Sequence, residues 1–175
     1  MKPEKSKNSG FTLVEMLVAI MVLSLAVAGP LTVVSKGISN TAYARDQITA
    51  VFLAQEGVEA VRNLRDSNGL AGAPWLQQFD SCAAADCGIN IIGSPPAITV
   101  NTCSALGNCL LYYNDSIGLY NHQTAGTEPA RFSRSFRLVP VDEKEARLTV
   151  TVSWQTNAVL PSRTFTVTTE LLNWQ

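Results

Sequence analysis

The sequence predicts an α+β fold in which one long N-terminal α-helix, transmembrane and then amphipathic, packs on a C-terminal antiparallel β-sheet. Three observations support this prediction. The run from Met16 to Val34 holds no charged residue. Apolar residues in 42–66 recur at three- and four-residue steps, and residues 131–175 alternate apolar with polar side chains, as half-buried strands do. The apolar stripe of the helix and the apolar face of the sheet can therefore cover each other.

Length and composition limit the organisation of the chain. Its 175 residues suggest one domain, or one domain plus an appendage. Charged residues make up 15% and the formal net charge is -1, so no basic surface indicates a nucleic-acid partner. Apolar residues concentrate at the N-terminus, whereas residues 67–130 are rich in Gly, Ala, Ser, Asn and Pro. This contrast predicts an anchor followed by a soluble head.

The N-terminus has the features of a targeting signal. Residues 1–10 contain three lysines and one glutamate, and the uncharged run from Met16 to Val34 follows. As a helix this run spans about 28 Å, close to the hydrocarbon thickness of a bilayer. The basic flank predicts a single pass through the cytoplasmic membrane, with the N-terminus in the cytoplasm and the head outside. Cleavage at Gly10 would leave the apolar segment on the mature protein, unlike cleavage of a secretory signal.

The stretch "GFTLVEMLVAI" after this basic leader resembles the type III signal of the type IV pilin and pseudopilin superfamily. The resemblance rests on Gly10, Phe11 and Glu15, and it covers about 25 residues closely and the following helix loosely. It implies that a prepilin peptidase cleaves the leader, residues 1–10, between Gly10 and Phe11. It also implies N-methylation of Phe11 and identifies Glu15 as the acid matching that of the family. The rest of the chain shares only a plan with the family.

Glu15 agrees physically with that assignment. A carboxylate inside an apolar run is costly in a bilayer, so such residues usually have a partner or a function. Cleavage after Gly10 would create a partner, the α-amino group of Phe11. Pairing within one helix gives some local attraction, whereas pairing between neighbouring helices would fix their axial stagger. In the alternative interpretation, Glu15 lies at the membrane interface with its carboxylate in water.

The helix divides into a transmembrane half, residues 11–34, and an amphipathic half, residues 35–66. Gly29 and Pro30 predict a kink or local melting, because proline lacks a backbone donor and clashes with the preceding turn. In the amphipathic half, the apolar stripe comprises Ala50, Leu53, Ala54, Gly57, Val58, Val61 and Leu64.

Polar residues occupy the opposite face of this half, with two candidate ion pairs, Glu59/Arg62 and Arg62/Asp66. The same face includes Gln55 and Glu56. Val51 and Phe52 lie off the apolar stripe, and they either contact neighbouring subunits or form an edge of the same core. The sequence "DSNG" at 66–69 is expected to end the helix.

The C-terminal region, residues 131–175, predicts three antiparallel strands. "RFSRSFRLVPV", "RLTVTVSW" and "RTFTVTTELLNW" each alternate apolar and polar residues. The first places Phe132, Phe136 and Leu138 on one face. The segments 142–145 and 155–162 are short enough to join the strands as a meander.

Residues 67–130 are expected to form an irregular loop region with short strands at "INII" and "CLLYYN". In a head outside the cytoplasm, its four cysteines favour two disulfides, and loop-closure entropy favours the local pairs. A zinc site is the alternative, although the spacings within each pair are marginal or wide for zinc ligands. The expected pairs are Cys82 with Cys87 and Cys103 with Cys109.

No constellation indicates an enzyme, a cofactor or a metal centre. The single histidine, His122, follows no catalytic motif, and a lone loop histidine is most often a solvated surface residue. Asn114 and Asp115 in "YYNDS" could help to hold calcium, as loops in some pseudopilins do. The stretch lacks an EF-hand-like spacing, so a plain turn is favoured.

Three functional hypotheses follow. The first is a pilin-like subunit that assembles through its N-terminal helix into a type IV pilus or related filament. Its large, cysteine-bearing loop favours a minor or tip-associated subunit over the bulk one. The second is a pseudopilin of a type II secretion system, in a periplasmic pseudopilus. The third is a membrane-anchored extracytoplasmic enzyme or binding domain. The stretch "AVFLAQEGVEAVRNLRD" resembles pilus-modification minor pilins and related pseudopilins. Implied partners are prepilin peptidase, other pilin or pseudopilin subunits, an inner-membrane assembly platform and membrane lipid.

Overall fold

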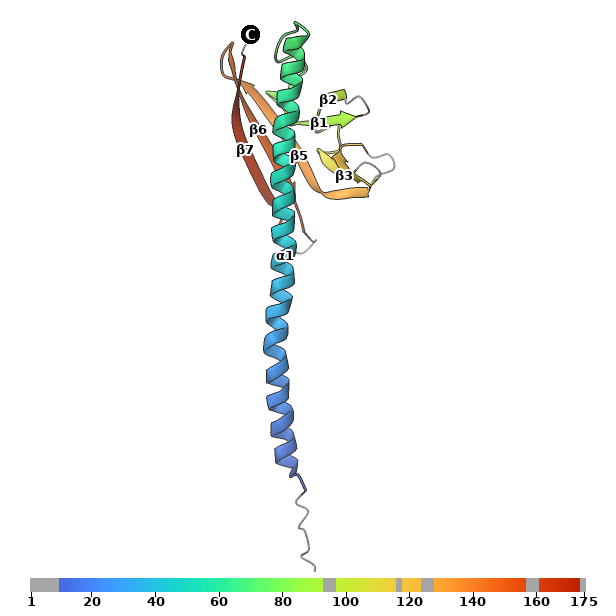
Figure 1. Cartoon of the computed structure of the whole chain (residues 1–175), viewed down its shortest axis with the longest axis vertical. Helices are drawn as coiled ribbons and strands as arrows, with labels where there is room; N and C mark the ends of the chain where they lie inside the picture. The colour runs from blue at the N-terminus through green and yellow to red at the C-terminus, as the bar shows by residue number, and fades with distance from the viewer. Residues whose placement is uncertain (1–9, 93–96, 116–117, 124–127, 157–160, 174–175) are drawn as a thin grey trace, which may run out of the picture. The chain divides into compact units, whose positions relative to one another are not determined.

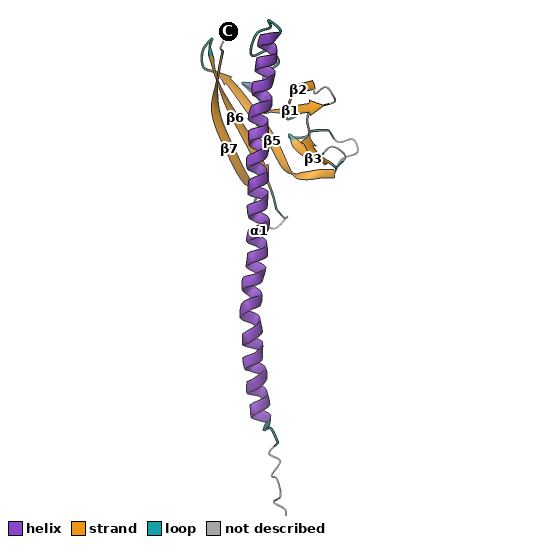
Figure 2. Cartoon of the chain, viewed as in Figure 1, coloured by secondary structure: helices purple, strands orange, loops and turns teal. Residues whose placement is uncertain are grey.

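A computed structural model describes residues 10–92, 97–115, 118–123, 128–156 and 161–173. The chain divides into two compact units, Met1–Ala42 and Tyr43–Gln175. Within the described residues there is one long helix, α1, which extends from Leu13 to Leu70, and the strands form one antiparallel sheet (Figures 1 and 2). The second half of α1 packs on this sheet, which confirms the predicted α+β class.

The first unit consists of the leader and the N-terminal part of α1. All of its residues from Gly10 to Asn40 are exposed in the single chain. Helical structure continues through Gly29 and Pro30, and the Thr32 hydroxyl donates a hydrogen bond of 2.7 Å to the Gly29 carbonyl. The kink expected at these two residues stays a prediction.

The second half of α1 buries the stripe that its periodicity predicts. Ala50, Ala54 and Val61 are completely buried, and the other four stripe residues are buried as well. Three further residues are buried on this face: Asp46, Ala60 and Asn68. Phe52 lies outside this core with 65% of its surface exposed.

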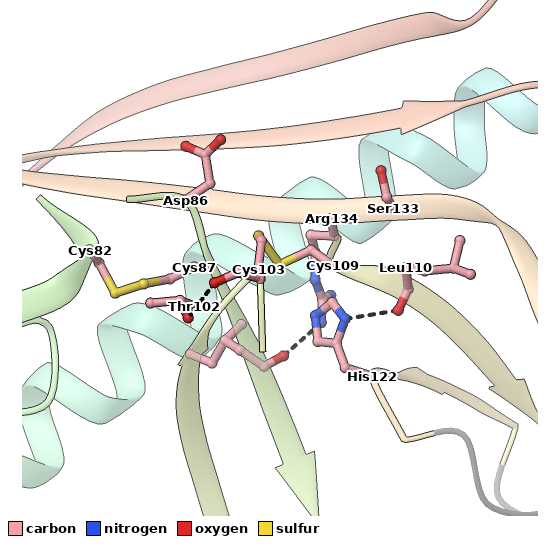
Figure 3. Close-up of a disulfide and its surroundings, with 12 residues drawn as sticks. Cys82, Asp86, Cys87, Thr102, Cys103, Cys109, Leu110, His122, Ser133 and Arg134 are labelled. Atoms are coloured by element: carbon pink, nitrogen blue, oxygen red, sulfur yellow. Dashed lines mark hydrogen bonds between the residues drawn. A yellow bond between two sulfur atoms is a disulfide. The ribbon is translucent and has the colours of Figure 1, made fainter. Parts of the chain in front are cut away.

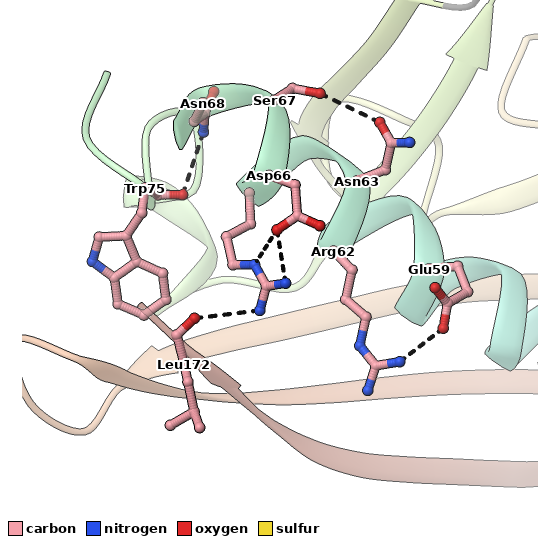
Figure 4. Close-up of polar contacts among 9 residues, drawn as sticks. Glu59, Arg62, Asn63, Asp66, Ser67, Asn68, Trp75 and Leu172 are labelled. Atoms are coloured by element: carbon pink, nitrogen blue, oxygen red, sulfur yellow. Dashed lines mark hydrogen bonds and ion pairs between the residues drawn. The ribbon is translucent and has the colours of Figure 1, made fainter. Parts of the chain in front are cut away.

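The helix ends slightly later than "DSNG" suggested, at Leu70. Gly72 takes a positive φ of 68°, a left-handed conformation that glycine adopts without strain. The Asn68 side-chain amide donates to the Trp75 carbonyl at 3.4 Å (Figure 4). It also donates to the Gln77 carbonyl at 3.0 Å. This amide therefore ties the loop after the helix back onto the last turn.

One of the two expected ion pairs on the exposed face forms. The Arg62 guanidinium lies 2.8 Å from the Glu59 carboxylate (Figure 4). The expected Arg62/Asp66 pair was wrong, because Asp66 instead pairs with Arg65 at 2.7 Å. Arg65 also donates to the Leu172 carbonyl at 3.4 Å, which connects the helix to the end of the last strand.

The predicted meander is present as β5 (Glu128–Pro140), β6 (Glu145–Trp154) and β7 (Arg163–Leu172). All three pair antiparallel, with Phe136 opposite Val150 and Val150 opposite Val167. The inward face holds Leu138, Leu148, Val150 and Val152, each almost fully buried. The outward face of these strands is rich in Ser and Thr, so the alternation predicted from the sequence sets the orientation of the sheet.

Residues 67–130 hold more regular structure than the sequence indicated. A short 3-10 helix, Asp80–Cys82, precedes β1 (Cys87–Ile92), β2 (Ala97–Thr102), β3 (Leu110–Asn114) and β4 (Leu119–Asn121). Within the described residues the strand order is β2-β1-β5-β3-β4, with β6 and β7 continuing from the other edge of β5. β1 and β3 correspond to the short strands expected from "INII" and "CLLYYN".

Candidate processing and assembly site

The residues at the predicted cleavage point lie immediately before α1. Gly10 and Phe11 are exposed, with 78% of Phe11 accessible, and the helix begins at Leu13. The Thr12 hydroxyl accepts a hydrogen bond of 3.2 Å from the Glu15 backbone N–H, so Thr12 is the N-cap. Glu15 lies in the first helical turn, where a negative charge is favourable beside the positive end of the helix dipole.

Thr12 was not singled out from the sequence, although the T-x-x-E pattern of Thr12 and Glu15 is the signature of a capping box. Glu15 can therefore act in two ways. It stabilises the start of its own helix, and its carboxylate is available to a positive charge outside it. The Phe11 amine, once formed, would be such a charge.

The helix that follows is suited to a membrane. Within the described residues, α1 is the one helix long and apolar enough to cross a bilayer by length and composition, and its most apolar window is 0% buried. Large apolar side chains such as Leu17, Ile20 and Leu25 are more than half exposed. In water this surface would be unfavourable, so lipid or other helices must cover it.

Residues 5–29 match the family model of the prokaryotic N-terminal methylation motif. The chain carries a prepilin signal of the type IV pilin and pseudopilin kind. The match covers residues 5–10 of the predicted leader, the predicted cleavage point and most of the apolar segment. Neither the curated proteins nor the solved structures give a significant match to the chain.

The prepilin signal implies processing by prepilin peptidase and assembly with other pilin subunits. Together with the exposed apolar helix, it indicates membrane anchoring. The motif marks pilin-type structural subunits, which are not enzymes. A long helix packed on an antiparallel sheet is also the layout of a pilin-like protein.

Two disulfides close short loops in the pilin-like head. Cys82 is bonded to Cys87 and Cys103 to Cys109, the two local pairs that loop-closure entropy favoured (Figure 3). All four sulfurs are used, so none is a thiolate ligand for zinc. The first pair joins the 3-10 helix to β1, and the second closes the loop between β2 and β3. Together they brace the connection that leads from α1 to the meander.

Arg134 is a buried cation that sequence reasoning missed. It lies on the inward face of β5 with 2% of its surface exposed, and its guanidinium is 3.1 Å from the Glu56 carboxylate of α1. It also donates to the carbonyls of Leu53 and Ile89, each at 3.3 Å. Burial lowers the pKa of Arg134, and the neighbouring Glu56 carboxylate offsets part of this decrease.

Gly57 makes room for this arrangement. A Cβ on Gly57 would lie 3.3 Å from the Arg134 Cδ and 3.1 Å from a methyl group of Val150. The glycine therefore lets the helix backbone approach the sheet where the cation crosses between them.

Asp46 is a second polar group held between the helix and the sheet. Its carboxylate lies 3.3 Å from the Arg131 guanidinium and accepts a hydrogen bond of 2.9 Å from the Thr156 hydroxyl. Only 6% of Asp46 is exposed. Together with the Glu56–Arg134 pair, it fixes the position of α1 on the meander through directional contacts.

His122 is buried, so the expectation of a solvated surface histidine was wrong. Its ring Nδ1 lies 3.0 Å from the Leu110 carbonyl (Figure 3). Its backbone N–H donates to Asn90 Oδ1 at 2.7 Å. Nε2 is buried with no hydrogen-bond partner. Burial lowers the pKa of His122 to about 4, aided by the Arg134 charge and opposed by the bond to Leu110. The ring is therefore neutral at physiological pH and joins β1, β3 and the end of β4.

Two other residues singled out from the sequence lie at turns or on the surface. Asn114 ends β3, and its carbonyl accepts a hydrogen bond of 2.8 Å from the Gly118 N–H, as in a turn. Asp115 is exposed.

Phe52, with Leu53, Leu119 and Tyr120, lines a hollow of about 200 Å³ between α1 and β4. Phe52 therefore borders the core without being covered by it.

Proposed function

We propose that the protein is a non-enzymatic, pilin-like structural subunit of a type IV pilus or related filament. Prepilin peptidase removes residues 1–10 by cutting between Gly10 and Phe11, and Phe11 becomes the N-methylated terminus. The observation that carries the proposal is the methylation motif at residues 5–29, placed at the start of a helix whose apolar side chains are exposed. Such a helix needs lipid before assembly and other helices after it.

The proposed subunit passes once through the cytoplasmic membrane before assembly. The basic leader places the N-terminus in the cytoplasm and the head outside. Residues 11–34 lie in lipid, and residues 35–66 present the amphipathic half of α1 to the sheet. An inner-membrane assembly platform then moves the subunit into an extracellular filament, in which the apolar segment exchanges lipid for neighbouring helices.

Glu15 is proposed to pair with the methylated amine of Phe11 on a neighbouring subunit. Two opposite charges that are buried as a pair in apolar surroundings cost far less free energy than either charge buried alone. The pair would also fix the axial stagger between helices. The Thr12 cap supports this role because it satisfies a backbone donor without using the Glu15 carboxylate.

We further propose that the subunit is a minor component of the filament. Support comes from the region between α1 and the meander, whose described residues form four additional strands and two disulfides. An elaborated head of this kind suits a subunit present at few positions, such as the tip, better than the bulk repeat.

The proposal is tested by the mass of the mature N-terminus and by co-purification with sheared filaments. The expected mature chain begins at methylated Phe11, and Gly10→Leu should retain the leader and abolish recovery in the filament fraction. Lys7→Ala is the matched control, because it changes the leader and leaves the cleavage residues intact. A mature chain that retains residues 1–10, or one that begins elsewhere, would refute the proposal.

A further inference from the structure

Within the described residues three strands pair on one side only: β2, β4 and β7. β4 has only three residues, so β2 and β7 are the two long edges of the sheet. β7 pairs with β6 over ten residue pairs without a register shift, and β2 pairs with β1 over six. They lie at opposite edges of the sheet (Figure 1). An edge strand presents unpaired backbone N–H and C=O groups that can bind another strand.

Neither edge has a proline, a lysine or a bulge within the described residues, and the two charges of β7, Arg163 and Glu170, lie near its ends. β7 has the sequence RTFTVTTELL and β2 has AITVNT, so both lack proline and lysine, and β2 lacks any charge. Proteins commonly block exposed edges with these residues or with bulges. Both strands are instead rich in Thr and β-branched residues, which favour extended pairing.

The inward side chains of both edges are incompletely covered. Phe165 and Val167 of β7, and Ile98 and Val100 of β2, are only partly buried against the core. Three of the four residues opposite them, Val150, Val152 and Ile89, are 0–1% exposed. The fourth, Ile91 opposite Ile98, is itself partly buried. A further strand beside either edge would bury more apolar surface on this face.

The direction of the two edge strands limits how they can pair. Every neighbouring pair in the path β2-β1-β5-β6-β7 is antiparallel, so β2 and β7 run in the same direction. Under the proposed function, all copies enter the filament from one membrane and share one orientation. An edge-to-edge contact between copies must then be parallel.

We propose that β7 of one copy pairs in parallel with β2 of the next copy, joining the heads into a continuous sheet. One parallel register brings similar side chains of β7 and β2 together on both faces of the joined sheet. It sets Phe165 against Ile98 and Val167 against Val100 on the inward face, and Thr166 against Thr99 on the outward face. Because two different edges meet, the contact is heterologous, and it can join a short run of neighbouring copies, such as those of a minor subunit at the tip. The inference rests on the proposed function and names the surface through which neighbouring heads associate.

Cysteine cross-linking between two differently tagged full-length copies tests this register. One copy carries Thr168→Cys and the other Asn101→Cys, which the parallel register places on adjacent strands about 4.8 Å apart, within disulfide reach. A second pair, Thr166→Cys with Thr99→Cys, lies at the same separation. Both pairs should give a mixed-tag dimer in filaments on a non-reducing gel, and none of the four single variants should do so.

A third pair decides the strand direction. Thr164→Cys with Asn101→Cys is four residues out of the parallel register, about 13 Å apart, but adjacent in the antiparallel one. It should give no mixed-tag dimer. Cross-linking of this pair, absence of dimers from the first two pairs, or disulfides to a different protein would each overturn the proposal.

The filament fraction separates this inference from the function on which it rests. If the tagged copies co-purify with filaments but the first two pairs fail to cross-link, the edge contact is wrong and the pilin-like function stands. If the copies are absent from filaments and never cleaved at Gly10, the proposed function itself fails.

Discussion

The Arg134 guanidinium of β5 lies 3.1 Å from the Glu56 carboxylate of α1, inside the interface between helix and sheet. Arg134 is 2% exposed, whereas Glu56 keeps about a third of its side chain in water. The pair is therefore unsymmetrical. Loss of the carboxylate leaves a buried cation, but loss of the cation leaves a carboxylate that water can still reach.

This asymmetry predicts unequal effects of the two substitutions. Glu56→Gln should lower the free energy of unfolding by about 2 kcal/mol, because the charge of Arg134 is then compensated only by carbonyls. Arg134→Met, which keeps most of the side-chain volume, should cost less. The double variant should be no less stable than Arg134→Met alone. Urea unfolding of the full chain in detergent measures all three.

Glu59→Gln is the matched control for this series. Glu59 pairs with Arg62 on the exposed face of the same helix, so its loss should change stability by less than about 0.5 kcal/mol. Additive costs of Glu56→Gln and Arg134→Met would contradict the coupling.

His122 predicts a stability that falls in acid. Its folded pKa is about 4, below the ordinary value of 6.5, so folding favours the neutral ring. The neutral His122 ring therefore contributes to the free energy of unfolding, at most about 3 kcal/mol. This contribution is complete above about pH 6.5 and is lost as the pH falls towards 4. The second proton would have to enter at Nε2, which is buried without an acceptor.

Unfolding free energies between pH 4 and pH 8 measure this dependence. His122→Gln, which can still donate to the Leu110 carbonyl, should flatten the profile in this window while lowering stability at pH 8. An unchanged slope in the variant would assign the acid sensitivity to other groups.

The disulfides predict a defined peptide map. Non-reducing digestion should yield Cys82 linked to Cys87 and Cys103 linked to Cys109, and no peptide that joins the two pairs. Each bridge closes a short loop, so its loss should cost about 2 kcal/mol by chain entropy. Cys103→Ser/Cys109→Ser, compared with Cys82→Ser/Cys87→Ser, separates the two contributions. Four free thiols in the native protein would contradict the pairing.

Much of the fold follows from the periodicity of the sequence, whereas its buried polar contacts do not. Position 134 shares its alternation with Phe132, Phe136 and Leu138, so its inward orientation is implied. Its partner, Glu56, lies on a helix far away in sequence and on a face that the pattern assigned to solvent. Long-range pairs of this kind depend on how elements dock, which local patterns do not encode.

The missed features have similar causes. β2 and β4 are short strands in a Gly- and Ser-rich region, where local composition favours loops and pairing with β1 and β3 decides the outcome. His122 is buried because β4 places it against β1 and β3. Thr12 is different, because the T-x-x-E capping pattern that it forms with Glu15 is present in the sequence. Glu15 was interpreted only as an acid inside the apolar run, so the cap was missed.

The two roles of Glu15 can be separated by substitution. Thr12→Ala removes the hydroxyl that caps the helix but keeps the carboxylate, whereas Glu15→Gln removes the charge and keeps the cap. If Glu15 pairs with a neighbouring Phe11 amine, Glu15→Gln should abolish incorporation into filaments, while cleavage and membrane insertion persist. Thr12→Ala should then assemble at near-normal levels. Equal defects in both variants would favour a helix-capping role instead.

Gly29 and Pro30 lie in the helix segment that we expect to adapt when the subunit moves from the lipid bilayer into the filament. Pro30 has no N–H to donate to the carbonyl of Ala26 four residues earlier, and such a group is costly in hydrocarbon unless the helix adapts locally. We therefore expect Gly29→Ala/Pro30→Ala to stiffen the segment and to reduce recovery in sheared filaments. Membrane levels and cleavage at Gly10 should be unchanged. Ala28→Gly, which softens the same turn, is the control that should assemble. Normal filament recovery of the double variant would show that extraction from the bilayer needs no flexible point here, and that proline at this position serves packing between helices instead.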